Sequence, residues 1–305
     1  MILDVISLGS SSKGNAYFLN VKRDGYDDNN ETFGLLIECG LDYETMSNRL
    51  HKYSDGRFKM SDIKVVLITH RHHDHSIAIK EMLDLNKRVF APKEVYDHYK
   101  IDLTKYQRNA FVVKHGTQRL MADWIIVKPL AVKHDEVLNL IEAKRSKGEK
   151  ITIDMTDDEN KEIENLAYII TINNNYNLLF MIDTMYNPYN LSKFRFDDIF
   201  IEANYFTAPI YFAYEDAKKN NDYGDIKRYE RLLYSHMSVE TCVKTLNGFD
   251  LSNTKRIFIT HTSSSQRVRG YEMKYYTHIA NKLKKGHNAR VFVLKENGGF
   301  HTGGI

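Results

Sequence analysis

The segment at residues 65–75 constrains the fold more than any other part of the chain. Four consecutive apolar residues lead into Thr-His-Arg-His-His-Asp-His. A short run rich in Val and Ile indicates a buried strand. In an extended segment His70 and His72 point the same way, so both imidazoles can bind one metal ion. As the chain bends into a helix, Asp74 and His75 turn towards a neighbouring point, which predicts two metals side by side.

The alternative interpretation is a surface loop that is merely rich in histidine. Such a loop has no reason to follow a buried strand and to supply ligands in the order H-x-H-x-D-H. His73 fills an unconstrained position in this order, so we expect it to face solvent or to contact a ligand from behind.

Further ligand types follow other predicted strands. The run 125–132 leads to His134, the run 178–182 leads to Asp183, and the run 257–260 leads to His261. Because a site at the ends of strands receives side chains from several of them, these residues are the expected remaining ligands.

Composition excludes several classes of protein. The 305 residues are 42% hydrophobic, but the apolar runs are far shorter than the ~20 residues that a membrane-spanning helix needs. A net charge of +3 is too small to attract nucleic acid over the whole surface, so any nucleic-acid contact would depend on local patches of basic residues. The two cysteines lie far apart, which excludes a disulfide scaffold and a cysteine zinc finger. The beginning of the chain lacks the pattern of a signal peptide, so we expect a cytoplasmic protein with no membrane partner.

Short strand-like runs separated by Gly, Asn and Asp recur along the chain, with helical spacing after Ser76 and Ser238, which are the expected N-caps. This order predicts an α/β chain with two antiparallel-rich or mixed sheets flanked by helices. The expected strands are 2–8, 16–21, 34–39, 65–69, 89–91, 111–113, 125–132, 167–172, 178–182, 199–201, 257–260 and 291–294.

The order of these residues resembles the metallo-β-lactamase superfamily, over nearly the whole chain from Ser-Leu-Gly-Ser-Ser-Ser-Lys-Gly-Asn at 7–15 onwards. The resemblance implies an αββα four-layer sandwich, here a single domain over 1–305. It also implies two divalent ions, Zn²⁺ or Mn²⁺, and the residue types suit both. By this likeness one ion is held by His70, His72 and His134, the other by Asp74, His75 and His261, and Asp183 bridges them.

The second half of the chain resembles the phosphodiesterase branch of the superfamily, in particular ribonuclease Z and the YycJ-like nucleases. Glu202 ends a strand in Ile-Phe-Ile-Glu-Ala-Asn, His236 precedes a helix in Tyr-Ser-His-Met-Ser, and Thr-His-Thr-Ser follows at 260–263. The resemblance implies a nuclease that acts through a hydroxide bridging the two metals, held by Asp74 and Asp183. In it, His236 donates a proton and Glu202 orients it, so the expected catalytic residues are Asp74, His236 and Glu202.

Two segments depart from a compact scaffold. The stretch at about 142–165 is dense in charge, and we expect an exposed excursion there. The stretch 204–235 interleaves aromatic and basic residues, which suits single-stranded DNA because rings stack on bases and cations neutralise phosphates. The expected substrate-binding residues are Lys227, Arg228, Arg231 and Ser263. An aromatic lid with a solvated basic face is the alternative.

The scaffold alone does not fix the substrate. The alternative function is a small-molecule metallohydrolase that acts on a lactone, a thioester or a cyclic phosphodiester. It would use the same seven ligands but would not need His236. The sequence leaves open the choice between zinc and manganese, between DNA and RNA, and the oligomeric state.

Overall fold

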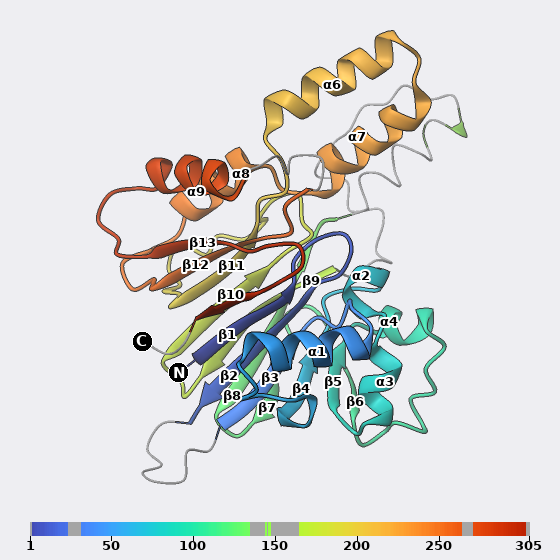
Figure 1. Ribbon diagram of the computed structural model, residues 1–305, viewed down its shortest axis with the longest axis vertical. Coiled ribbons are helices and arrows are strands. Elements are labelled where there is room, and N and C mark those ends of the chain that lie inside the picture. The colour runs from blue at the N-terminus through green and yellow to red at the C-terminus, as the bar shows by residue number, and fades with distance from the viewer. Residues whose placement is uncertain are drawn as a thin grey trace.

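Two seven-stranded mixed sheets form the centre of the molecule (Figure 1). The computed structural model describes residues 2–23, 32–134, 144, 146–147, 165–263 and 271–302. The first sheet has the order β14-β1-β2-β3-β4-β5-β6. Its strands are β1 (Ile2–Gly9), β2 (Ala16–Lys22), β3 (Thr32–Ile37), β4 (Ile63–Leu67), β5 (Arg88–Ala91), β6 (Ala110–Val112) and β14 (Phe300–Thr302).

The second sheet also has seven strands, in the order β13-β12-β11-β10-β9-β8-β7. Strands β7 to β10 pair antiparallel, and β10 to β13 pair parallel. Its strands are β7 (Arg119–Ala122), β8 (Ile125–Val132), β9 (Asn165–Ile172), β10 (Tyr176–Met181), β11 (Asp198–Glu202), β12 (Arg256–Thr260) and β13 (Arg290–Val293).

The two sheets pack face to face over an apolar core. Aromatic rings from both sheets meet there: Tyr17 of β2 lies 5.5 Å from Phe180 and 5.8 Å from Phe200, and Phe200 stacks on Phe258 at 4.3 Å between ring centroids. All four rings are fully buried. This shared core fixes how the sheets lie relative to each other, and therefore how their ends meet.

Helices cover the outer face of each sheet (Figure 1). Apolar residues of α1 (Tyr43–Tyr53), α3 (Ile79–Asp84) and α4 (Lys93–His98) pack on the first sheet. Those of α8 (Val239–Asn247) and α9 (Tyr271–Lys282) pack on the second. The predicted αββα four-layer sandwich is therefore confirmed.

One predicted helix start is wrong and another is confirmed. Ser76 is the last residue of a four-residue helix, α2 (His73–Ser76), and α3 begins after Ala78. The helix starts early because the residues after His72 already turn, so the Ser76 N–H and hydroxyl both bond the His72 carbonyl oxygen. By contrast, the Ser238 hydroxyl caps α8 by accepting the Thr241 N–H at 3.1 Å.

The aromatic and basic stretch 204–235 forms a helical hairpin, α6 (Thr207–Lys219) and α7 (Tyr223–Ser235), which projects beyond the sandwich (Figure 1). Ile210 and Ala217 of α6 are buried against Tyr229 of α7. The charged excursion at about 142–165 falls almost entirely outside the described residues. No helix in the described ranges is long and apolar enough to cross a membrane.

Candidate metal centre

Several potential ligands lie at the carboxyl ends of strands, on one edge of the sandwich. The first sheet contributes His70, which follows β4. The second contributes His134 after β8, Asp183 after β10 and His261 after β12, while Glu202 is the last residue of β11. All five are nearly inaccessible to solvent. The packing of the two sheets thus brings residues from distant parts of the sequence to one place.

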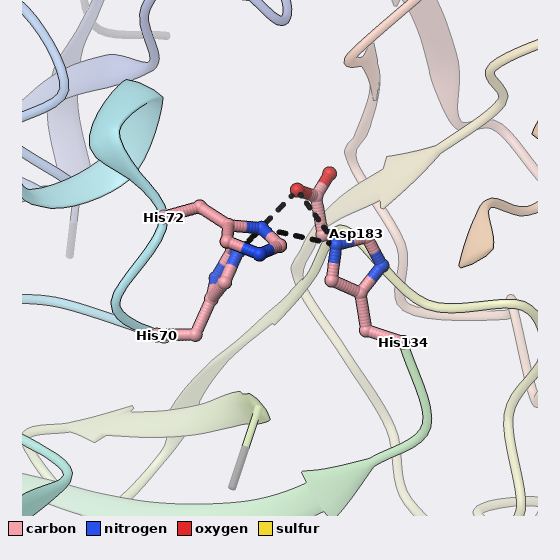
Figure 2. Close-up of side chains that lie close together, drawn as sticks. All are labelled: His70, His72, His134 and Asp183. Carbon is pink, nitrogen blue, oxygen red and sulfur yellow. Dashed lines mark hydrogen bonds and ion pairs between the residues drawn. The ribbon is translucent and has the colours of Figure 1, made fainter. Parts of the chain in front are cut away.

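Three of these side chains, His70, His134 and Asp183, converge on one point together with His72, as Figure 2 shows. His70 Nε2 lies 2.9 Å from His72 Nδ1, and His134 Nε2 lies 3.3 Å from the same nitrogen. The Asp183 Oδ2 atom is 3.6 Å from His70 Nε2 and 3.7 Å from His134 Nε2.

The hydrogen bonds behind two of these rings set which nitrogen faces the point of convergence. His134 Nδ1 lies 2.7 Å from the Ser235 carbonyl oxygen and must donate to it. The Thr69 hydroxyl donates to Glu38 at 2.5 Å, so it accepts from His70 Nδ1 at 2.9 Å. Neutral rings held in this way present the lone pairs of Nε2 to a common point, which fits a cation.

A second cluster shares Asp183 and adds Asp74, His75 and His261. His75 Nε2 lies 2.9 Å from Asp183 Oδ2 and 3.3 Å from Asp74 Oδ2. His261 Nε2 is buried, faces Asp74 Oδ2 at 3.6 Å, and has no hydrogen-bond partner within the described chain. A buried nitrogen of this kind is expensive unless something binds it, so this cluster also fits a cation.

The charges within the second cluster keep both carboxyl groups ionised. Burial alone would raise the pKa of Asp74, but the charge of His75, together with the His261 and His75 nitrogens that face the carboxylate, holds it well below its usual range. Burial opposes ionisation of Asp183 as well, and the charges of His261 and His75 lower its pKa. A divalent cation bound to the neutral rings would take the place of these positive charges beside the two carboxylates, so this donor set suits a metal.

Left-handed backbone turns aim three side chains of the site. His261, directly after β12, has φ 50°, and Glu38, directly after β3, has φ 64°. Asp183, two residues beyond the end of β10, has φ 49°. This conformation costs free energy for residues other than glycine, and such strain is concentrated at functional sites. The sharp turn ends each strand and swings the side chain over the sheet edge.

The sequence interpretation did not single out Glu38, Gly40 or the contacts of Asn15. Glu38 is buried and contacts Thr69 and His75, while the Asn15 amide group lies 3.3 Å from Asp74 Oδ2 and 3.1 Å from His75 Nε2. A Cβ atom on Gly40 would collide with the Asp74 carbonyl oxygen. The available signal was a carboxylate and a glycine directly after the apolar run Leu-Leu-Ile at 35–37.

The expected catalytic pair is in contact. His236 Nδ1 lies 2.7 Å from Glu202 Oε1, and Glu202 also accepts the Thr184 N–H at 3.0 Å. Burial would raise the pKa of Glu202, but the charge and hydrogen bond of His236 lower it. Since Nδ1 is bound to Glu202, Nε2 of His236 is the nitrogen left for a substrate. Glu202 and His236 also form a third group with Asp183 and His261.

A cavity of about 380 Å³ opens at the second cluster. Its walls include Asp74, Asp183 and His261, together with His236. Three of the four expected substrate-binding residues also line it: Arg228, Arg231 and Ser263. The fourth, Lys227, lies exposed on α7 and lines neither this cavity nor the larger one described below. We call this cavity the metal pocket. His73 is exposed and belongs to neither cluster of ligands.

The fold and the clusters together define a two-sheet sandwich with histidine and aspartate ligands at one sheet edge. A family model described as the beta-lactamase superfamily domain matches residues 34–262. The chain belongs to this superfamily, as its sequence predicted. None of the curated proteins matches the sequence.

Solved structures share the fold at low sequence identity. The Zn²⁺-bound PqqB of Methylobacterium extorquens is 11% identical, with a TM-score of 0.59 over 98% of this chain and 99% of that one. A diphosphatase from the PhnP family is 14% identical, with a TM-score of 0.56 over 99% and 97%. The short form of human tRNase Z is 12% identical, with a TM-score of 0.54 over 99% of each chain. These likenesses describe the fold.

Proposed function

We propose that this protein is a dinuclear metal-dependent phosphodiesterase, and specifically a nuclease that prefers single-stranded DNA. The observation that carries the proposal is His236, which lines the metal pocket together with two arginines and is bonded from behind by the buried Glu202. Hydrolysis of a carbonyl compound has no need of this pair, whereas a phosphodiester develops negative charge on several oxygens as it reacts. The tRNase Z and PhnP-family diphosphatase structures, whose names describe phosphate chemistry, support this choice of substrate class.

His70, His72 and His134 would hold one divalent ion, and Asp74, His75 and His261 the other, with Asp183 between them. Bound ions at these positions supply Lewis acidity and lower the pKa of water towards neutrality. Asp74 lines the metal pocket, and its carboxylate would accept a hydrogen bond from the attacking water and orient it.

His236 acts on the other side of the phosphorus atom. Glu202 accepts the Nδ1–H, which fixes the ring and leaves Nε2 to hold a proton for a phosphoryl or leaving oxygen. The guanidinium groups of Arg228 and Arg231 line the same pocket and can bind the charged oxygens of a phosphate. Arg231 has no ion pair or hydrogen bond of its own in the described chain, so it is free to do this.

The test is hydrolysis of a bis-aryl phosphodiester and of labelled single-stranded DNA, duplex DNA and RNA, with Mn²⁺ or Zn²⁺ added. We expect cleavage of the diester and fastest cleavage of single-stranded DNA. His72→Ala should lose bound metal and activity together. His73→Ala is the matched control, because this neighbouring histidine is exposed, and it should keep both.

His236→Ala separates the proposal from the alternative hydrolase. It should retain its metal and lose about 10²- to 10⁴-fold in rate, the usual contribution of a general acid. A wild-type rate in His236→Ala on the best substrate would instead favour a lactone or thioester hydrolase. Full activity in His72→Ala would overturn the metal assignment itself.

A further inference from the structure

A second and larger cavity, of about 610 Å³, adjoins the metal pocket. Among the described residues, His236 is the one that lines both. The walls of this cavity, which we call the side pocket, come mainly from the stretch 185–191 after β10 and from α8 and the residues next to it, and Tyr205 and Leu233 complete the lining. A substrate that spans both pockets therefore crosses His236, the residue proposed to act on the scissile group.

The side pocket carries one lysine and no carboxylate among its described lining residues. The chain as a whole has 40 acidic residues against 43 basic ones, so a cavity of this size without an acid favours an anion. Lys244 of α8 is exposed and makes no ion pair or hydrogen bond through its side chain in the described chain. Its ammonium group is available to a ligand.

The rest of the lining suits a flat heterocycle. The lining includes Tyr186, Tyr189 and Asn190, together with the buried apolar residues Leu191 and Phe249. The Tyr186 side chain has no partner in the described chain, so its ring can stack on a base. The Asn190 amide oxygen accepts from the Ser192 N–H and hydroxyl, so its NH2 group is the part left to donate to the edge of a base.

Contacts with the rest of the protein hold the stretch 185–191 of the side pocket in place. The Tyr189 hydroxyl donates to the Ala131 carbonyl oxygen at 2.6 Å, and its ring stacks on His115 at 5.7 Å. The Asn187 side chain bonds both backbone groups of Tyr189, and the Met185 N–H bonds the Lys133 carbonyl oxygen at 3.1 Å. Because these contacts fix the segment without a ligand, the pocket is preformed, which lowers the cost of binding.

We propose that the side pocket binds the nucleotide unit on one side of the scissile phosphate, with its base against Tyr186 and Asn190 and its own phosphate on Lys244. This inference rests on the proposed phosphodiesterase activity and narrows its substrate. Cations then lie on both sides of His236. Arg228 and Arg231 line the metal pocket, and Lys244 lines the side pocket. The preferred substrate therefore carries a phosphate beyond the one that is cleaved, as an oligonucleotide does and a bis-aryl phosphodiester does not.

Binding is measured first, with thymidine 3′,5′-bisphosphate as the probe and isothermal titration calorimetry of the full-length, metal-loaded protein. Lys244→Ala and Tyr186→Ala should each weaken binding roughly tenfold, as expected for one phosphate contact or one stacked base. Lys285→Ala is the matched control, since Lys285 is exposed and lines neither pocket, and it should bind as the wild type does. Equal affinity in all four proteins, or no binding to the wild type, would overturn the side-pocket assignment.

Kinetics supply the second readout. Lys244→Ala and Lys244→Glu should raise KM for a short oligonucleotide at least tenfold more than KM for bis(p-nitrophenyl) phosphate. If both substrates are affected equally, the side pocket does not bind a nucleotide, and the phosphodiesterase assignment stands. If the bisphosphate binds through Lys244 and Tyr186 but no phosphodiester is cleaved, the proposed function fails while the binding site stands.

Discussion

Glu38 contacts residues of both ligand clusters, although it belongs to neither cluster itself. Its carboxylate accepts the Thr69 hydroxyl at 2.5 Å, and Thr69 holds His70, while Oε1 also lies 3.4 Å from His75 Nδ1. Burial raises the pKa of Glu38, against the lowering effects of His75 and Thr69. Its position thus sets the orientation of one histidine from each cluster.

We expect Glu38→Gln to weaken metal binding about 10- to 100-fold, the usual effect of removing a carboxylate behind a ligand. Oε1 faces both the Thr69 hydroxyl and His75 Nδ1, and Oε2 accepts the Thr69 N–H, so the amide places an NH2 group against at least one of these donors. Competition with a chromophoric chelator measures the affinity. Glu44→Gln, an exposed substitution on α1, is the control and should bind metal normally. Equal affinity in the two variants would show that Glu38 only fills space.

Two cations on α7 differ in position and should differ in effect. Arg231 lines the metal pocket and Lys227 does not. Arg231→Ala should raise KM for oligonucleotides about tenfold, the effect of losing one charged contact to a phosphate. Lys227→Ala should change KM less than twofold at 0.15 M salt, where exposed charges are screened. Steady-state kinetics at two salt concentrations test this, and an equal rise in both variants would indicate a diffuse electrostatic effect.

At the scale of elements, the sequence predicted the strands better than the helices. The strand β8 is rich in Ile and Val, and β12 is rich in Ile and Phe, so the pattern that predicts them is local. The strands β7 and β14 were missed, because each is a short edge strand with a partly exposed surface. The hairpin of α6 and α7 was not predicted as helical, because its apolar residues pack mainly on each other and on Tyr205.

The residues of the candidate site also fall into a group that the sequence predicted and a group that it did not. The seven expected ligands follow strands, so residue type and position alone pointed to them. Glu38, Asn15 and Gly40 act through contacts with Asp74, His75 and Thr69, which depend on how β3 lies beside β4. A single sequence carries no pattern for such contacts.

The pairing of β11 with β12 contains a buried ion pair opposite the site. Asp198 and Arg256 are register partners, both almost fully buried, with Arg256 Nε 2.9 Å from Asp198 Oδ1. Burial would lower the pKa of Arg256, and Asp198 raises it above its ordinary value. Arg256 also donates to Thr302 of β14, so this pair joins the two sheets.

Arg256→Met should destabilise the protein by about 3–5 kcal/mol, because it leaves the Asp198 carboxylate buried without a cation, with the Tyr176 hydroxyl at 2.7 Å as its remaining side-chain partner. The double variant Asp198→Leu/Arg256→Met should recover most of this loss, since no buried charge remains. Urea denaturation followed by circular dichroism gives the free energy of unfolding for each protein. A double variant as unstable as the single one would show that packing around Arg256, and not its charge, is what matters.

At the scale of the whole molecule, the ligands lie on both sheets. His70, His72 and the residues of α2 extend from β4 in the first sheet, while His134, Asp183 and His261 follow strands of the second. A metal ion that binds them bridges the two layers at the edge, where the aromatic core between the sheets ends. Metal binding and global stability are therefore coupled, because the unfolded chain holds these residues far apart.

This coupling predicts the response of the folded protein to metal. With free Zn²⁺ at about 100 times its dissociation constant, stability should rise by about 2.7 kcal/mol, which for a chain of this length raises Tm by ~4 °C. A chelator should reverse the shift. His72→Ala should lose most of it and His73→Ala should keep it, since His72 faces the cluster and His73 faces solvent. Differential scanning calorimetry measures all three proteins, and a shift of the same size in His72→Ala would mean that zinc stabilises the fold from elsewhere.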